Sequence, residues 1–169
     1  MASELWETAG ELPNQPLFRV HHADSGTIRS PGDGFRTQNR DWLRDEDEFY
    51  YALQDHLKFY NDEPTPFISV TDSAMGAADR ARWMKERGYR NVCIAVIDPR
   101  AIGSRALNVR RATAYLRLYI KPDVFPHTEG ELVYLRRIPE DAVDGEYSNL
   151  GHFRRAFGGS KGTRGFGTS

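Results

Sequence analysis

Six consecutive apolar residues, 92–97 (VCIAVI), lie near the centre of this 169-residue chain. The run is rich in β-branched residues, which is typical of a strand buried on both faces of a sheet. A chain with such a strand needs further strands beside it and packed layers on its two sides. Cys93 is expected to be a core residue of this strand, and as the single cysteine it excludes a disulfide-stapled scaffold.

Three other short segments have the composition of strands, and two longer ones that of helices. The strands are predicted at 17–20 (LFRV), 67–71 (FISVT) and 131–135 (ELVYL). Apolar residues at intervals of three and four predict one helix over 46–60. A second helix is predicted between a cap at Asp72 or Ser73 and a stop at Gly88. Segment 104–119 is compatible with either a helix or a strand.

The predicted strands and helices do not alternate regularly, which favours the α+β class over a doubly wound sheet. One domain is expected over 1–150, with a loose lead-in over its first 13 residues and a long ordered loop over 21–40. The remaining segment, 151–169, has four cations, no acid and many glycines. It is therefore predicted to be a flexible basic tail.

Composition and charge exclude several classes of protein. The net charge of −1 gives no global attraction to nucleic acid or to a membrane surface, and no apolar run reaches the roughly 20 residues that span a bilayer. The N-terminal segment has acids and prolines where a signal peptide needs a basic and then an apolar stretch, so a cytoplasmic location is expected. The five histidines have no metal-ligand spacing with the cysteine or with one another, so no metal site is expected.

Three short segments contain the candidate site residues. Arg19 is a cation within an otherwise apolar strand, and Ser69 and Thr71 alternate with apolar residues, so both are expected on one face. Glu129 and Glu131 flank a glycine where a strand begins, and strand alternation would direct both carboxylates to one side. Each group also has a purely structural interpretation. In it, Arg19 forms an ion pair at a sheet edge, and Ser69 and Thr71 are ordinary strand residues on a solvated face. Glu129 and Glu131 then belong to a solvated turn.

Taken in order, these segments resemble the ADP-ribosyltransferase toxin superfamily, most closely its Arg–Ser–Glu class with pierisin-like and cholera-toxin-like members, and fungal domains of the same general shape. The matching succession is Leu-Phe-Arg, Ser30-Pro31 and Gly34-Phe35, Pro-Phe-Ile-Ser-Val-Thr, a buried strand ending in Ile97-Asp98, and Glu-x-Glu before Arg-Ile-Pro. The resemblance covers about three quarters of the chain, from Leu17 to Asp144. It implies an α+β fold of two small packed β-sheets with flanking helices and an NAD cleft between the sheets.

The resemblance also implies a role for each candidate residue. Arg19 corresponds to the first-strand arginine that supports the dinucleotide, since a planar guanidinium suits phosphate or ribose oxygens. Ser69 and Thr71 correspond to the two serines of a Ser-Thr-Ser strand that braces the cleft. Glu131 corresponds to the catalytic glutamate, and Glu129 to the position at which glutamate favours arginine as the acceptor. The implied activity is that of an NAD-dependent mono-ADP-ribosyltransferase or NAD glycohydrolase, with NAD as substrate and a protein as acceptor.

The chemistry suits these residue types. Cleavage of the nicotinamide–ribose bond develops an oxocarbenium cation, which a carboxylate at Glu131 would stabilise. Glu129 would accept a proton from the acceptor or position it. No metal is required, and an aromatic side chain is expected to stack on the nicotinamide, with Phe67, Tyr115 and Phe125 among the candidates. Two alternatives stay open: a catalytically inactive domain of the same fold that acts as a binding module, and a nucleotide-binding protein that acts on RNA ends through its basic tail.

Overall fold

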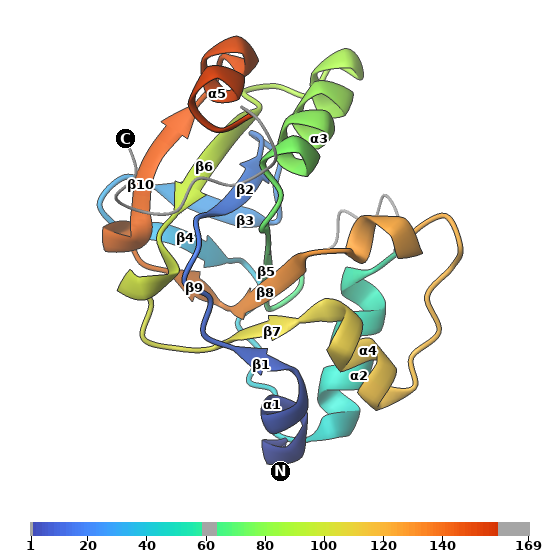
Figure 1. Ribbon diagram of the computed structural model, residues 1–169. Helices are drawn as coiled ribbons and strands as arrows, with labels where there is room; N and C mark the ends of the chain where they lie inside the picture. The colour runs from blue at the N-terminus through green and yellow to red at the C-terminus, as the bar shows by residue number, and fades with distance from the viewer. Residues whose placement is uncertain (1, 59–63, 159–169) are drawn as a thin grey trace.

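The computed structural model describes residues 2–58 and 64–158. Within these ranges the chain forms five α-helices and two antiparallel sheets, one of seven strands and one of three (Figure 1). The predicted α+β class is therefore confirmed. No helix in these ranges has both the length and the apolar character needed to cross a membrane.

The larger sheet has the strand order β1-β7-β8-β5-β2-β6-β10, and the smaller sheet has the order β3-β4-β9. The strands are β1 (Gly10–Glu11), β2 (Leu17–His21), β3 (Thr27–Ser30), β4 (Gly34–Thr37), β5 (Phe67–Thr71), β6 (Cys93–Ile97), β7 (Ala106–Asn108), β8 (Glu131–Leu135), β9 (Arg137–Ile138) and β10 (Val143–Tyr147). The helices are α1 (Ser3–Ala9), α2 (Glu46–His56), α3 (Ala74–Glu86), α4 (Val109–Leu116) and α5 (Leu150–Phe157). Short 3₁₀ helices lie at η1 (Pro99–Ala101), η2 (Phe125–Thr128) and η3 (Glu140–Ala142).

The larger sheet is covered on both faces. The smaller sheet packs against one face, where Phe35 lies in a core with Leu17, Ile68 and Tyr134. The other face is covered by two groups of helices (Figure 1). Helices α1, α2 and α4 pack over the half that contains β8 and β5, whereas α3 and α5 pack over the half that contains β2 and β6.

Several predicted elements are confirmed with small changes at their ends. Strands β2, β5 and β8 occupy the predicted segments, and the side chain of Ser73 caps α3 by accepting a hydrogen bond from the backbone N–H of Gly76 at 2.9 Å. Helix α2 ends at His56, and residues 59–60 of the predicted helix lie outside the described residues. Strand β6 is buried from Ile94 to Ile97, but Cys93 is only half-buried at its start and is not a core residue.

Two predictions are wrong, and the structure decides a third that the sequence left open. The lead-in contains α1 and β1, because Leu5 and Ala9 recur four residues apart and bury one face of a short helix. The segment predicted as a long loop contains the hairpin of β3 and β4. Segment 104–119 contains a strand followed by a helix, β7 and α4, rather than one element of either kind.

The boundary predicted for the basic tail is also wrong. Residues 151–157, assigned to that tail from their charge, belong to α5. Phe153 is fully buried there, and its ring packs edge-on against Phe18 at 5.5 Å between ring centroids. Residues 159–169 of the predicted tail lie outside the described residues.

Candidate functional site

The candidate site lies where β2 meets β5, between the two groups of helices. The registered pair between these strands is Phe18 opposite Thr71, while β5 and β8 pair over five positions, with Thr71 opposite Glu131. Cross-strand partners share a face of a sheet, and residues two apart on one strand also share a face. Ser69, Thr71 and Glu131 therefore project from the helix-covered face, on which Phe67 packs against α2.

Ser69 and Glu131, two of the candidate residues, are in direct contact. The Ser69 hydroxyl donates a hydrogen bond to Oε2 of Glu131 at 2.7 Å. The Glu131 side chain is 18% exposed, so the carboxylate is largely buried but still reachable. Burial raises the pKa of Glu131, while the Ser69 hydrogen bond and the charges of Arg80 and Arg19 oppose that rise. The Ser69 hydrogen bond thus fixes the orientation of a carboxylate whose ionised form is favoured by the charges of Arg80 and Arg19.

His56 completes this contact, although the sequence analysis did not select it. Its Nε2 lies 2.5 Å from Oγ of Ser69 and 3.9 Å from Oε2 of Glu131, and its Nδ1 lies 2.7 Å from Oγ1 of Thr65. Burial, together with the charges of Arg19 and Arg80, lowers the pKa of His56 to about 4. The imidazole is therefore neutral at physiological pH.

A neutral imidazole leaves one consistent arrangement of hydrogens. Because Ser69 donates to Glu131, its oxygen accepts from the Nε2–H of His56, and Nδ1 then accepts from the hydroxyl of Thr65. Every donor in this series of hydrogen bonds, from Thr65 to Ser69, points toward the Glu131 carboxylate. Aligned hydrogen bonds of this kind polarise one another. The sequence contained one signal for it, since His56 follows Phe49 and Leu53 on the buried face of α2.

Arg19 reaches the same residue from the opposite face of the sheet. It follows Phe18 on β2, so its side chain starts toward the smaller sheet, where its guanidinium lies 5.7 Å from the centre of the Phe35 ring. Its Nη1 donates a hydrogen bond to the backbone carbonyl of Ser69 at 2.9 Å. Among the described residues, no ion pair joins Arg19 directly to Glu131, so Ser69 links the two.

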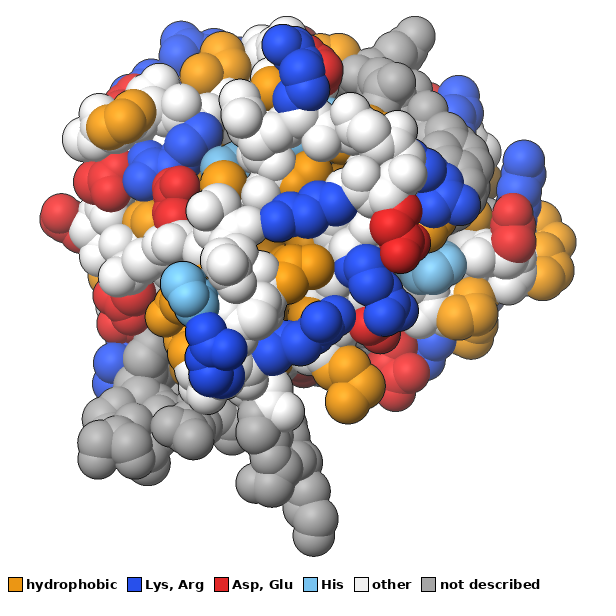
Figure 2. All heavy atoms as spheres, turned by 90° about the horizontal axis from the view of Figure 1, so that it is seen from above, with side chains coloured by type: hydrophobic (Ala, Val, Ile, Leu, Met, Phe, Trp, Pro, Cys, Tyr) orange, Lys and Arg blue, Asp and Glu red, His pale blue; other side chains and the backbone are white. Residues whose placement is uncertain are grey.

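The surroundings of Arg19 disfavour its charged form. Burial and the charge of Arg80 lower the pKa of Arg19 to about 10, while Glu131 opposes that shift. Arg19 is still protonated at neutral pH, and its Nε is buried without a hydrogen-bond partner. Arg80, exposed on α3, therefore acts on the same site. Figure 2 shows basic side chains across the middle of the face seen from above, next to hydrophobic surface.

Thr71 and Glu129 have other surroundings. Thr71 shares the face of Ser69, but its Oγ1 accepts a hydrogen bond from the backbone N–H of Ser73 at 3.1 Å and holds the turn into α3. Glu129 is exposed and ends η2, before β8 begins. Gly130 has a φ of +71°, and a Cβ there would lie 2.2 Å from Oδ1 of Asp72. The expectation that strand alternation directs Glu129 and Glu131 to one side is therefore wrong.

A groove of about 850 Å³ lies next to these residues. It is lined by residues 39–44, by one side of α2 and by residues 64–66. Thr65 connects the groove to the candidate site, because it lines the groove and hydrogen-bonds His56. The lining does not include Arg19, Ser69 or Glu131.

The three aromatic residues considered for stacking differ in their surroundings. The Phe67 ring is buried and packs edge-on against His56 at 5.6 Å between ring centroids. The Tyr115 hydroxyl donates to Glu46 at 2.7 Å, at the first residue of α2, whereas Ser69 contacts His56 at the last. Phe125 is exposed beneath the guanidinium of Arg110. Of these three, Phe67 contacts the site, and it does so through His56.

Comparison with protein-family models matches most of the chain. Residues 13–149 match the family model described as a domain of unknown function, DUF7587. Comparisons with curated proteins and with solved structures found no match to the chain. The matched segment contains the whole candidate site, from β2 to β8.

Proposed function

The chain belongs to the DUF7587 family, and we propose that it is an NAD-dependent mono-ADP-ribosyltransferase or NAD glycohydrolase. One observation carries this proposal: Ser69 holds the Glu131 carboxylate through its hydroxyl and the Arg19 guanidinium through its carbonyl. We also propose that the two sheets correspond to the packed sheets of the ADP-ribosyltransferase fold, and that the protein acts in the cytoplasm, where NAD is available.

In this proposal, Glu131 stabilises the charge that develops during cleavage. The bond between C1′ of the ribose and the nicotinamide nitrogen breaks, and the electron pair leaves with neutral nicotinamide. The ribose acquires oxocarbenium character, which a fixed carboxylate close to C1′ stabilises electrostatically. Water or a nucleophile of a protein acceptor then attacks C1′ and loses a proton. We assign the uptake of that proton to Glu129, which is exposed at the entrance of β8 and accessible to a bound acceptor.

The hydrogen-bond chain from Thr65 through His56 to Ser69 supports this role. Its donors all point toward Glu131, so it favours the ionised form of a carboxylate whose pKa is raised by burial. His56 acts through Ser69 and is therefore a positioning residue.

The electrostatic coupling between Arg19 and Arg80 supports the binding of a diphosphate. The charge of Arg80 lowers the pKa of Arg19, which means that the two guanidinium groups repel each other. A bound dianion relieves this repulsion and can satisfy the buried Nε of Arg19. The diphosphate of NAD has this charge, and its nicotinamide ribose would then lie toward Glu131.

The test is nicotinamide release from NAD by the purified protein, with and without an arginine-rich acceptor protein. We expect release by the wild type and a loss of at least about 100-fold in Glu131→Gln, since one electrostatic contact to a transition state supplies about 3 kcal/mol. Glu7→Gln, an exposed change on α1, is the matched control. Absence of both NAD binding and nicotinamide release in the wild type contradicts the proposal.

One observation favours the alternative of an inactive binding domain. The polar groups of the site are already bonded to one another, since both the hydroxyl and the carbonyl of Ser69 have partners. A domain that retains this arrangement without catalysis would bind NAD and release no nicotinamide. Calorimetric titration with NAD, run beside the release assay, separates the two functions.

A further inference from the structure

Three side chains that can ligate a metal meet on neighbouring strands, on the face of the larger sheet that packs against the smaller sheet. His21 on β2 is the cross-strand partner of Cys93 on β6. Glu146 on β10 is the partner of Ala95, which lies two residues after Cys93 and therefore on the same face. The register thus places the imidazole, the thiol and the carboxylate on one face of three neighbouring strands.

The ligand atoms are close enough for one ion. The His21, Cys93 and Glu146 ligand atoms all lie within 4.8 Å of one another, and Nε2 of His21 is 3.9 Å from Oε2 of Glu146. Tetrahedral Zn²⁺ with these ligand types requires separations of roughly 3.3–3.8 Å, from bond lengths of about 2.0–2.3 Å. The His21–Glu146 separation is already close to this range.

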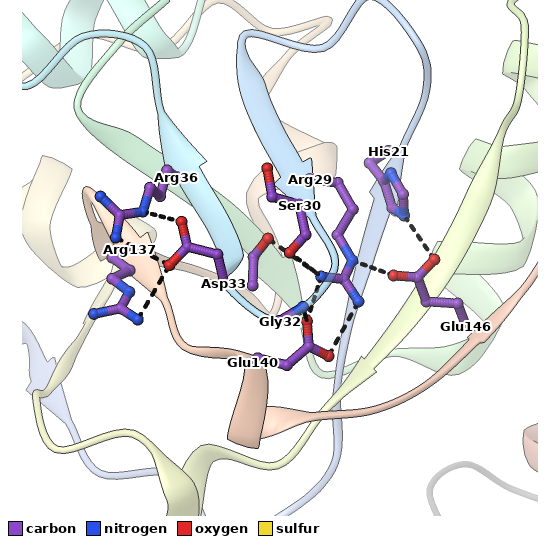
Figure 3. Close-up of polar contacts among 10 residues, drawn as sticks. His21, Arg29, Ser30, Gly32, Asp33, Arg36, Arg137, Glu140 and Glu146 are labelled. Atoms are coloured by element: carbon purple, nitrogen blue, oxygen red, sulfur yellow. Dashed lines mark hydrogen bonds and ion pairs between the residues drawn. The ribbon is translucent and has the colours of Figure 1, made fainter.

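His21 provides an independent indication of a ligand. Only 8% of this residue is exposed, and its Nε2 is buried without a hydrogen-bond partner among the described residues. Buried polar atoms nearly always have a partner, so an imidazole nitrogen without one needs an explanation. This nitrogen points toward Glu146 (Figure 3).

Glu146 is oriented as a ligand would be. Nε of Arg29 bonds Oε1 of Glu146, while Oε2 faces His21 (Figure 3). Ligating carboxylates are commonly held in this way by a hydrogen bond to the oxygen that does not bind the metal. Arg29 also bonds Glu140 at 2.7 Å, which offsets part of its positive charge near the cluster. Cys93 is half-buried, so an ion can reach the thiol from solvent.

We propose that His21, Cys93 and Glu146 form a zinc site that joins β2, β6 and β10. Nitrogen, thiolate and carboxylate ligands together suit Zn²⁺, and three protein ligands leave a fourth position for water. Binding releases the thiol proton to solvent, and the thiolate and carboxylate then balance the charge of the ion. The site lies two residues beyond Arg19 on β2, so the ion would also stiffen the strand that carries this arginine.

The experiment uses the full chain without a histidine tag, treated with a chelator and then titrated with Co²⁺. We expect about one Co²⁺ ion to bind per chain and to give a near-ultraviolet thiolate-to-cobalt absorption band. Added Zn²⁺ should displace the Co²⁺ and abolish the band. Because Cys93 is the single cysteine, its alkylation reports occupancy directly, and we expect Zn²⁺ to slow alkylation at least about tenfold.

Variants assign the ligands. We expect Cys93→Ser to abolish the thiolate band, and His21→Asn and Glu146→Gln to weaken Co²⁺ binding at least about tenfold. His152→Asn, an exposed change on α5, is the matched control and should bind as the wild type does. If a variant fails to fold, the wild type alone decides. Absence of the thiolate band, or alkylation unaffected by Zn²⁺, overturns the proposal whatever the outcome of the NAD assay.

Discussion

Ser69 is the residue on which the candidate site depends. Its carbonyl accepts from Arg19, and its hydroxyl lies between His56 and Glu131. A single strand residue therefore connects groups from both faces of the larger sheet.

Arg19→Lys tests the role of the guanidinium. A lysine retains the charge but loses the planar set of donors, so we expect NAD affinity to fall about tenfold. Isothermal titration calorimetry measures this change, and thermal unfolding checks that the fold is retained. Arg154→Lys on α5 is the matched control. Unchanged affinity in Arg19→Lys would remove Arg19 from the proposed binding site.

The lowered pKa of His56 predicts that the stability of the fold depends on pH. Burial lowers its pKa in the folded protein from 6.5 to about 4, so the unfolded chain binds a proton in this range that the folded protein does not. The free energy of unfolding should therefore fall as the pH falls from 6.5 to about 4, by about 2 kcal/mol near pH 5 for this residue. Urea unfolding at a series of pH values measures the effect.

Two other titratable groups modify that dependence. His21, whose pKa is also lowered to about 4, acts in the same direction, whereas the raised pKa of Glu131 stabilises the fold as the pH falls. His56→Asn should flatten the decline, while His152→Asn should leave it unchanged. A decline of the same size in His56→Asn would show that His56 is not its source.

At the scale of elements, the turn between β3 and β4 explains why the sequence predicted a loop there. The hairpin strands are four residues each, and two glycines with positive φ, Gly32 and Gly34, flank Asp33. Such short strands with few apolar residues produce little alternation. What stabilises them is the packing of Phe35 against the larger sheet, which is not a local property.

Gly34→Ala and Gly32→Ala form a matched pair that tests this turn. Both residues have a positive φ, but a Cβ at Gly34 would lie 2.0 Å from the carbonyl oxygen of Ile138, whereas a Cβ at Gly32 has open space. We expect Gly32→Ala to cost about 1 kcal/mol from backbone strain, and Gly34→Ala to cost several times more because β9 must move. Equal losses in chemical denaturation would contradict this account.

At the scale of the whole molecule, Arg29 joins the two sheets. It lies on β3 of the smaller sheet and bonds Glu140 on η3 and Glu146 on β10 of the larger one (Figure 3). Its side chain is 18% exposed, and its two hydrogen-bonded acids raise its pKa further. The network therefore holds the small sheet over the face that contains Arg19 and His21.

Arg29→Ala tests this connection. Removing the cation leaves two partly buried carboxylates close together, and we expect a loss of about 2 kcal/mol, between the values for exposed and buried pairs. Adding Glu140→Gln should recover part of the lost free energy of unfolding, because it removes one of the two carboxylate charges left unpaired. Arg90→Ala, which removes an exposed pair with Asp24, should cost much less.

Local patterns in the chain were sufficient to predict β2, β5, β6 and β8, both central helices and the α+β class, because burial on a sheet or helix face imposes a periodicity. They also identified Ser69 and Glu131, which the structure brings into contact. Folding in three dimensions decided the rest. His56 joins Ser69 only because α2 packs across β5, and the His21, Cys93 and Glu146 cluster arises from strand register between segments far apart in the chain. Pairings of this kind depend on which strands become neighbours, and no spacing along the sequence encodes that.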